Sequence, residues 1–222
     1  MGDPNKLIVV VKNKVLFGDG NEDYFEGFRP AEEINYESRI LKNYKIMRRG
    51  STEEPKDHPK GNAELNTDYK QPIGYTILFN PNLKKVFAYQ RSSKDEKYCE
   101  KRLQGKWSWG FGGHIEPSDN VKGNMLRESV MREVTREEVL IDGKIIDMKS
   151  MGYINYDSND VSKVHFAMLY GLSTDAERIV AKDKEIARVE LLSLSELEEM
   201  CSLGANVEVW SRIALEPLRK LL

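Results

Sequence analysis

An apolar helical stripe that carries acidic side chains is the feature that most constrains this chain. Over residues 126–141 the apolar residues recur at helical spacing, so at about 100° per residue they share the helix face that meets a core. The residues of this face are Leu126, Val130, Val134 and Ile141. Glu137 falls in the middle of the face and Glu133 lies at its edge, one turn earlier. The pattern therefore predicts a core helix with carboxylates on its buried side.

These two carboxylates need a partner. An ionised carboxylate on an apolar stripe costs several kcal/mol unless it is paired or bound to a cation, and two of them four residues apart repel each other. Mg²⁺ removes this cost, because it takes one or two protein carboxylates together with phosphate oxygens of a substrate. Gly112-Gly113 precedes the helix and predicts a turn at which the backbone can approach a phosphate group. The segment therefore predicts a divalent-cation site.

The composition limits the class of protein. A chain of 222 residues can form one large domain, or one domain with an appendage, and bury a sizeable core. Its formal net charge of -2 argues against nucleic-acid binding, which leaves a basic footprint. No apolar run approaches the roughly 18 residues of a membrane span, and the N-terminus lacks the pattern of a secretory signal. Cys99 and Cys201 have no metal-ligand spacing and are typical of free thiols in a reducing compartment. We therefore expect a cytoplasmic protein with neither membrane nor nucleic-acid partners.

The N-terminal third has weaker patterns than the rest. Residues 7–17 consist of two apolar runs around Lys12-Asn13-Lys14 and predict a short hairpin. Residues 36–48 have apolar side chains at helical spacing and predict a helix. Residues 51–69 are polar, contain two prolines and predict a loop.

A second region begins at Ile73. It opens with a strand-turn-strand pattern around Asn80-Pro81-Asn82. Further strands are expected at residues 107–111, 145–154 and 164–171, and further helices at residues 193–200 and 207–222. The helix at 193–200 opens with a Ser-x-x-Glu capping box. Strands mixed with separate helices predict an α+β fold or a three-layer α/β/α packing.

The residues of the acidic segment resemble the box of the Nudix family. Gly113, an acid six residues later (Asp119), Arg132-Glu133-Val134 and Glu137 match the pattern G-x5-E-x7-R-E-U-x-E-E-x-G-U, in which U is aliphatic. The order of strands from Ile73 onward is also similar to that of a Nudix domain. The resemblance implies a Nudix-like α/β/α sandwich with a mixed sheet.

In this interpretation residues 73–222 form the hydrolase domain and residues 1–72 an N-terminal extension that packs on it. The extension could add strands to the same sheet, provide a dimer contact or cap the substrate. Self-association as a homodimer stays open.

Two departures concern the length of the motif. The stretch between Asp119 and Arg132 is five residues longer than in the family pattern, which predicts a lengthened loop ahead of the helix. Val139 takes the place of the last glycine, which predicts that the helix continues to Gly143.

A third departure concerns the metal ligands. Arg136 stands where the first glutamate of the Glu-Glu pair is expected, so a site built from three helix glutamates loses one ligand. Glu138 lies about 100° from Glu137 on an α-helix and would be a poor replacement.

The resemblance implies a hydrolase that cleaves the diphosphate linkage of a nucleoside diphosphate derivative, a small-molecule substrate, with Mg²⁺ or Mn²⁺ as cofactor. Pyrophosphate cleavage places charge on non-bridging oxygens, so catalysis consists mostly of charge neutralisation and positioning of water. Glu133 and Glu137 are the expected metal ligands and catalytic residues, with Glu116 as a third candidate ligand. Arg132 would orient both helix glutamates by charge-assisted hydrogen bonds.

The candidates for substrate binding are Gly112, Gly113, Arg91, Arg102 and His165. The two arginines flank a lysine-rich segment and could contact phosphates, although surface charge is the ordinary alternative. The histidine alternates with apolar residues on a strand, where a satisfied core residue is the ordinary alternative. By the resemblance, the general base lies in a loop before a late strand, which indicates Glu185.

Two other functions remain. An isomerase of the same fold that acts on isopentenyl diphosphate would need a reactive cysteine in the pocket, and neither Cys99 nor Cys201 lies in a motif that supports one. A non-catalytic module that binds a nucleotide or a protein would agree with the arginine at position 136, whereas the retained Glu133 and Glu137 favour catalysis.

Overall fold

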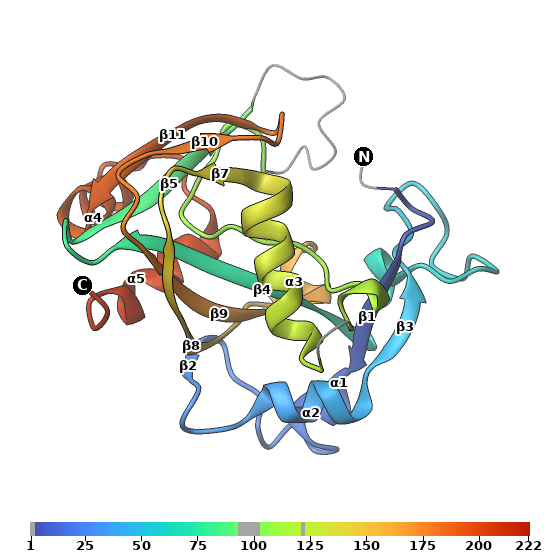
Figure 1. Cartoon of the computed structure of the whole chain (residues 1–222). Coiled ribbons are helices and arrows are strands. Elements are labelled where there is room, and N and C mark those ends of the chain that lie inside the picture. Colours follow the sequence, from blue (N-terminus) through green and yellow to red (C-terminus); the bar gives the residue numbers. More distant parts are fainter. Residues whose placement is uncertain (1–2, 93–102, 121–122) are drawn as a thin grey trace.

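One mixed β-sheet organises the molecule (Figure 1). The computed structural model describes residues 3–92, 103–120 and 123–222. In this part of the chain the strands are β1 (Leu7–Lys12), β2 (Gly27–Pro30), β3 (Lys45–Arg48), β4 (Tyr69–Asn80), β5 (Lys85–Arg91), β6 (Trp107–Ser108), β7 (Val139–Ile141), β8 (Ile145–Asn155), β9 (His165–Thr174), β10 (Ile179–Ala181) and β11 (Ile186–Ser193).

The main path of this nine-stranded sheet is β11-β5-β4-β9-β8-β2, with β1 joined to β4, β3 to β1 and β6 to β5. The central pair β4 and β9 is parallel, and the neighbours on either side are antiparallel to them. β7 and β10 form a separate two-stranded ladder. The sheet is therefore mixed, as expected from the sequence.

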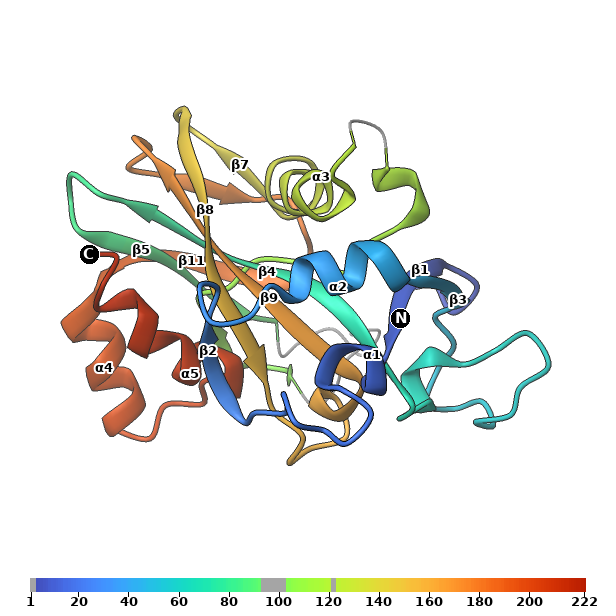
Figure 2. The same ribbon diagram turned by 90° about the horizontal axis from the view of Figure 1, so that it is seen from below.

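The helices of the described residues are α1 (Asn13–Phe17), α2 (Tyr36–Asn43), α3 (Met125–Arg132), α4 (Leu194–Ser202) and α5 (Val209–Leu218), the 3-10 turns η1 (Ala63–Leu65), η3 (Pro117–Asp119) and η5 (Ser162–Val164), and the π-helical turn η4 (Glu133–Glu138). Seen from below, α3 lies on one side of the sheet and α4 and α5 lie on the other (Figure 2). This arrangement is the predicted α/β/α sandwich.

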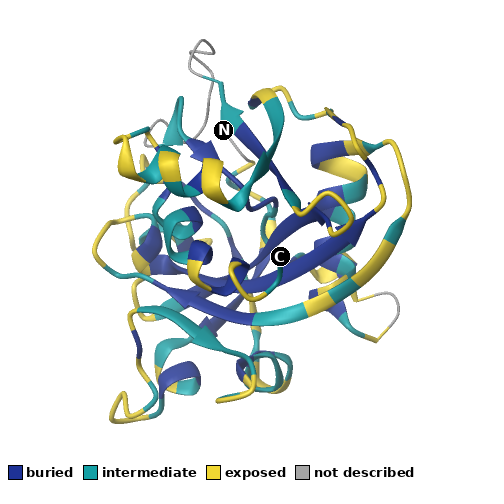
Figure 3. Cartoon of the chain, turned by 90° about the vertical axis from the view of Figure 1, so that its left-hand side faces the viewer, coloured by how far each residue is buried: buried dark blue, intermediate teal, exposed yellow. Residues whose placement is uncertain are grey.

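The side chains of β4 explain why both faces of the sheet need a cover. Tyr75, Ile77 and Phe79 pack into an apolar cluster with α4 and α5. Leu78 points to the opposite face and packs into the cluster that contains Val134 of η4. The central strands are accordingly buried on both faces, whereas exposed residues gather on the outer surfaces of the helices and in loops (Figure 3).

The N-terminal segment adds strands to the same sheet. β2 pairs with β8, and β1 pairs with the start of β4. Buried Lys70 of β4 forms an ion pair with Asp157, which follows β8. Of the three roles considered for residues 1–72, added strands are therefore present in the structure. The division between residues 72 and 73 stays a prediction, and β4 runs across it.

Two N-terminal elements differ from the prediction. The chain makes a single helical turn, α1, where a hairpin around Lys12-Asn13-Lys14 was expected, because Leu16 and Phe17 pack into the core beneath α2. The predicted helix 36–48 ends at Asn43, because the residues after it extend as β3 and pair with β1. In both places a tertiary contact outweighs a local pattern.

The helix predicted over residues 126–141 is also shorter. It ends at Glu138, and the next three residues form β7, which pairs with β10. The amide of Lys182 donates to the carbonyl of Glu138 at 2.8 Å, which closes the end of the helix. Ile141 therefore lies on a strand, and the expected continuation to Gly143 is wrong.

Other elements agree with the sequence. β4 and β5 form the predicted strand-turn-strand unit, with Phe79 opposite Val86. The Asn80 side chain accepts hydrogen bonds from the amides of the turn that follows it. α4 begins with the expected capping box between Ser193 and Glu196.

Candidate metal centre

Arg132, at the end of α3, anchors the turn that precedes the helix. Its Nε and Nη2 donate to the two carboxylate oxygens of Asp119 at 2.7 and 2.9 Å, and Nη2 also donates to the carbonyl of His114 at 2.9 Å. Asp119 is only 4% exposed, and it accepts a further hydrogen bond from the amide of Glu116. The longer stretch between the acid and the arginine therefore leaves their bidentate pairing intact.

The same guanidinium gathers three glutamates. Arg132 Nη1 donates to Oε1 of Glu133 at 2.7 Å and to Oε1 of Glu137 at 2.8 Å. It also lies 3.2 Å from Oε1 of Glu116, which in turn forms a 2.6 Å ion pair with Lys6. One carboxylate oxygen from each glutamate lies within 4.8 Å of the others, an arrangement that could hold a metal ion. The structure thus brings together all three residues expected to bind metal.

Burial shapes the protonation of this cluster. Desolvation raises the pKa of Glu133 to about 6, despite the opposing effect of Arg132. Desolvation, reinforced by the charge of Glu133, raises the pKa of Glu138 to about 8. Oε2 of Glu138 is buried and has no hydrogen-bond partner in the described part of the chain. Carboxylates held in this way bind protons or cations, and their oxygens are the donor type that Mg²⁺ and Mn²⁺ prefer.

The two glycines before the helix make close contacts that no side chain would permit. A Cβ on Gly113 would lie 2.5 Å from Oε1 of Glu133, so the bare backbone passes directly beside this carboxylate. Gly112 has a φ of +152°, and a Cβ there would lie 1.7 Å from the carbonyl oxygen of Gly74. The predicted turn is therefore located against the carboxylate cluster.

The π-helical turn η4 changes the interpretation of Arg136. In a π-helix each turn holds one residue more than in an α-helix, because the backbone hydrogen bond spans five residues; here the amide of Val139 bonds to the carbonyl of Val134. Glu137 and Glu138, four and five residues after Glu133, therefore occupy places that the third and fourth residues take on an α-helix. Those are the places of the Glu-Glu pair in the Nudix box. The geometry favours one inserted residue over the loss of a ligand.

Glu138 thus lies close to the carboxylate cluster, although the sequence interpretation rejected it as a poor replacement for the missing ligand. On an ideal α-helix it points away from the cluster, whereas in η4 it is buried, and the nearby Gly112 amide partly offsets the rise of its pKa. A signal was present in the sequence: an intact Glu-Glu pair displaced by one position. Arg136, in contrast, is exposed to solvent.

Replacing Arg136 by Glu separates the two interpretations. If a ligand had been lost by substitution, the new carboxylate would strengthen Mg²⁺ binding markedly. Because the side chain at position 136 is exposed, we expect the Mg²⁺ dissociation constant to change by no more than about twofold, the effect of a screened surface charge. Calorimetric titration of the wild type and the variant with MgCl₂ measures the difference, and a tenfold gain in affinity would contradict the insertion.

Glu185, the candidate general base, lies in a loop tied to the metal-site helix. Within this loop the amides of Lys182 and Asp183 donate to the carbonyl of Glu138. Glu185 is half-buried, and its pKa is raised by burial and by the neighbouring Asp183. Its carbonyl accepts from the amide of Ser92, just beyond β5. The loop thus links the end of η4 to the edge of β5, while the role of Glu185 stays a prediction.

The other candidate substrate contacts fall in different places. Arg91 ends β5, pairs with Glu208 and stacks over the ring of Tyr89 at 5.4 Å. Arg102 lies outside the described residues. His165 is buried at the start of β9 beside His114, and it forms no hydrogen bond to Arg132 or to the three glutamates. Binding of substrate by any of the three stays a prediction.

Comparisons with known proteins agree with this architecture. No family model matches the chain. It is 29% identical over 225 residues to Protein YmaB of Bacillus subtilis (strain 168), a match that covers 98% of this chain and 100% of that protein. The crystal structure of Tm1382, a candidate Nudix hydrolase, is similar with a TM-score of 0.71 and 24% identity, covering 98% of this chain and 100% of that chain. The NUDIX domain of Shewanella oneidensis NrtR, complexed with ADP ribose, is similar with a TM-score of 0.51 and 16% identity, covering 68% and 88%.

The chain has the Nudix fold. The likeness to Tm1382 spans the N-terminal strands as well as the sandwich, because it covers almost the whole of both chains. The fold implied by the residues of the acidic segment is therefore confirmed.

Proposed function

We propose that this protein is a Nudix-type pyrophosphohydrolase that uses Mg²⁺ or Mn²⁺ to cleave a diphosphate linkage. The observation that carries the proposal is the convergence of Glu116, Glu133 and Glu137 on one point beside the Gly112-Gly113 turn. The negative charge of such a cluster is poorly neutralised without a bound cation. Its ion pairs join two cationic groups, Arg132 and Lys6, to four acids, namely the three glutamates and Asp119.

Each residue has a role that follows from its contacts. Glu116, Glu133 and Glu137 would hold the metal, which when bound supplies positive charge for the phosphate oxygens and for an attacking water. Arg132 is a positioning residue that fixes two of these carboxylates through one nitrogen. Gly113 lets the backbone pass beside the Glu133 carboxylate, where a side chain would not fit.

Proton transfer would fall to a group with a raised pKa. Glu185 fits this requirement, because burial and Asp183 both favour its neutral form and so make its carboxylate a stronger base. Its loop is bonded to the end of η4, so the base would be held at a fixed distance from the metal ligands.

The substrate class proposed is a nucleoside diphosphate linked to a second group. Support comes from the NrtR domain, whose structure contains ADP ribose. Arg91 and Arg102 remain the proposed phosphate contacts and His165 a proposed substrate contact. We also propose that the protein acts in the cytoplasm; no helix in the described part of the chain is long and apolar enough to cross a membrane.

A panel of nucleoside diphosphate derivatives, assayed with Mg²⁺, with Mn²⁺ and with EDTA, tests this function. We expect at least one compound to be split at its diphosphate with release of a nucleoside monophosphate, and EDTA to abolish the reaction until metal is restored. Product analysis by ion-exchange chromatography identifies the bond that breaks. Cleavage that persists at full rate in EDTA would contradict the proposal.

Neither alternative function is favoured by a specific observation. The isomerase would need a reactive thiol, and Cys201 is half-buried among α4 and α5, where burial raises the pKa of its thiol. Cys99 lies outside the described residues. The hypothesis of a binding module was based on the apparent loss of a metal ligand at Arg136. One inserted residue in η4 explains the arginine at this position without such a loss.

A further inference from the structure

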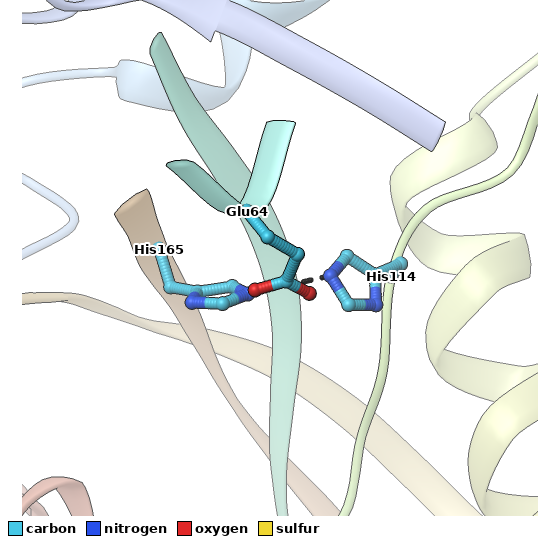
Figure 4. Close-up of side chains that lie close together, drawn as sticks. All are labelled: Glu64, His114 and His165. Atoms are coloured by element: carbon cyan, nitrogen blue, oxygen red, sulfur yellow. Dashed lines mark hydrogen bonds between the residues drawn. The ribbon is translucent and has the colours of Figure 1, made fainter. Parts of the chain in front are cut away.

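A second cluster of potential ligands lies apart from the carboxylate centre. Glu64, His114 and His165 each offer one ligand atom, and these atoms lie within 4.8 Å of one another. Figure 4 shows the Glu64 carboxylate directed into the space between the two imidazole rings. The three residues come from η1 in the N-terminal segment, from the turn after Gly113 and from the start of β9.

The protons of this cluster can be counted. His165 Nδ1 lies 2.6 Å from the carbonyl oxygen of Val161, which can only accept, so Nδ1 carries a hydrogen. A neutral His165 ring carries only one ring hydrogen, which Nδ1 holds. His165 Nε2 then presents a lone pair, and the structure places it 3.3 Å from Nε2 of His114.

The cluster contains more hydrogen-bond acceptors than hydrogens to satisfy them. At most one hydrogen, on His114 Nε2, is present for His165 Nε2 and for Oε1 of Gln71 at 2.7 Å, whereas Oε1 of Glu64 accepts from Arg49. Turning the Gln71 amide removes even this hydrogen, because its nitrogen would donate to His114 Nε2. In the present orientation that nitrogen is buried without a partner among the described residues. A lone pair on His165 Nε2 beside the Glu64 carboxylate is an arrangement that a bound cation stabilises, and the ion would replace Gln71 as the partner of His114 Nε2.

The distances suit a transition metal. Two imidazole nitrogens bound to one tetrahedral Zn²⁺ at about 2.0–2.1 Å lie about 3.3–3.4 Å apart, which is the separation of the two Nε2 atoms here. Imidazole nitrogen with one carboxylate is a donor set for Zn²⁺, whereas Mg²⁺ requires oxygen ligands.

The groups that form hydrogen bonds with these candidate ligands are also typical of a metal site. The Nδ1–H of His165 is held by a backbone carbonyl, the usual outer partner of a metal-bound imidazole. Arg49 Nε donates to Oε1 of Glu64 at 2.9 Å and so fixes the carboxylate. The side chain of Glu64 is only 9% exposed, and His165 only 7%.

We propose that Glu64, His114 and His165 form a Zn²⁺-binding site, separate from the carboxylate centre, that joins the N-terminal segment to the Nudix fold. The ion would connect η1, β9 and the glycine turn. His114 takes part in both centres: its ring faces Glu64 and His165, and its carbonyl accepts from Arg132. Occupancy would therefore stabilise the turn that contacts the Glu133 carboxylate.

The test is a titration of the full-length, metal-stripped protein with ZnCl₂ in an excess of MgCl₂, which fills oxygen-only sites. We expect one Zn²⁺ per chain in the wild type, and an affinity at least about 100-fold weaker in His165→Gln and in Glu64→Gln, each of which lacks one ligand. Zn²⁺ should also raise the melting temperature of the wild type and not of these variants. Glu64→Gln keeps the experiment decisive if His165→Gln does not fold.

Two control variants locate the ion. His58→Gln removes the remaining histidine of the chain, which lies outside the cluster, and should bind Zn²⁺ as the wild type does. Glu137→Gln should also retain Zn²⁺, so the result does not depend on hydrolase activity. Co²⁺ in place of Zn²⁺ should give visible absorption bands in the wild type and in His58→Gln. These bands should be absent in His165→Gln. No Zn²⁺ uptake by the wild type in excess Mg²⁺, or unchanged uptake by both Glu64→Gln and His165→Gln, would overturn the proposal.

Discussion

Replacing Glu137 by Gln is expected to reduce Mg²⁺-dependent diphosphate cleavage to below about 1% of the wild-type rate. The amide keeps the size of the side chain but removes the charge that faces Glu116 and Glu133. It also offers a hydrogen where a metal ion needs a lone pair. Since Glu137 is 46% exposed, the substitution should leave the fold intact.

The assay is initial-rate kinetics on the best substrate of the panel, together with calorimetric titration with MgCl₂. Glu128→Gln is a matched control, because Glu128 lies on α3 and outside the carboxylate cluster. We expect this control to retain wild-type activity and metal affinity, and both variants to give the circular dichroism spectrum of the wild type. Full activity in Glu137→Gln would remove Glu137 from the site.

Much of the sandwich follows from local patterns in the sequence. Long strands buried on both faces, such as β4 and β9, contain apolar runs, and α4 begins with a recognisable capping box. These signals lie within a few residues of each other and need no tertiary information. Among the elements that escaped prediction, α1 and β3 exist because partners elsewhere in the chain, α2 and β1, cover or pair with them.

The candidate site was predictable where it rests on one helix and one turn. The site residues Glu133, Glu137 and Gly113 lie in one short segment of the sequence. Helical geometry brings the two carboxylates together beside the glycine turn. The place of Glu138 was not predictable from an ideal helix, because a π-helical turn depends on how the chain is held at its end, here by the loop at Lys182. Glu64 carries no sequence signal at all, since only the folded sheet brings it to the two histidines.

Among substitutions in the carboxylate cluster, Arg132→Met is expected to lower the stability of the fold most. The guanidinium is 13% exposed and bonded to Asp119, Glu133 and Glu137. Without it the buried Asp119 loses its counter-charge and the glutamates repel one another. Breaking a buried ion pair by removing one partner costs about 3–5 kcal/mol, which for a chain of this length lowers Tm by about 6–20 °C.

Magnesium should offset part of this loss, and the offset identifies the cause. In Arg132→Met a bound cation takes over the neutralisation of Glu133 and Glu137, so MgCl₂ should raise the Tm of the variant by more than it raises that of the wild type. Arg136→Met, which removes an exposed arginine from the same helical segment, should keep the Tm of the wild type in EDTA and in MgCl₂. Thermal unfolding followed by circular dichroism in both conditions measures these differences. An unchanged Tm for Arg132→Met in EDTA would mean that the ion pairs around Arg132 add nothing to stability. The carboxylates would then have to be held in place by the helix and the glycine turn alone.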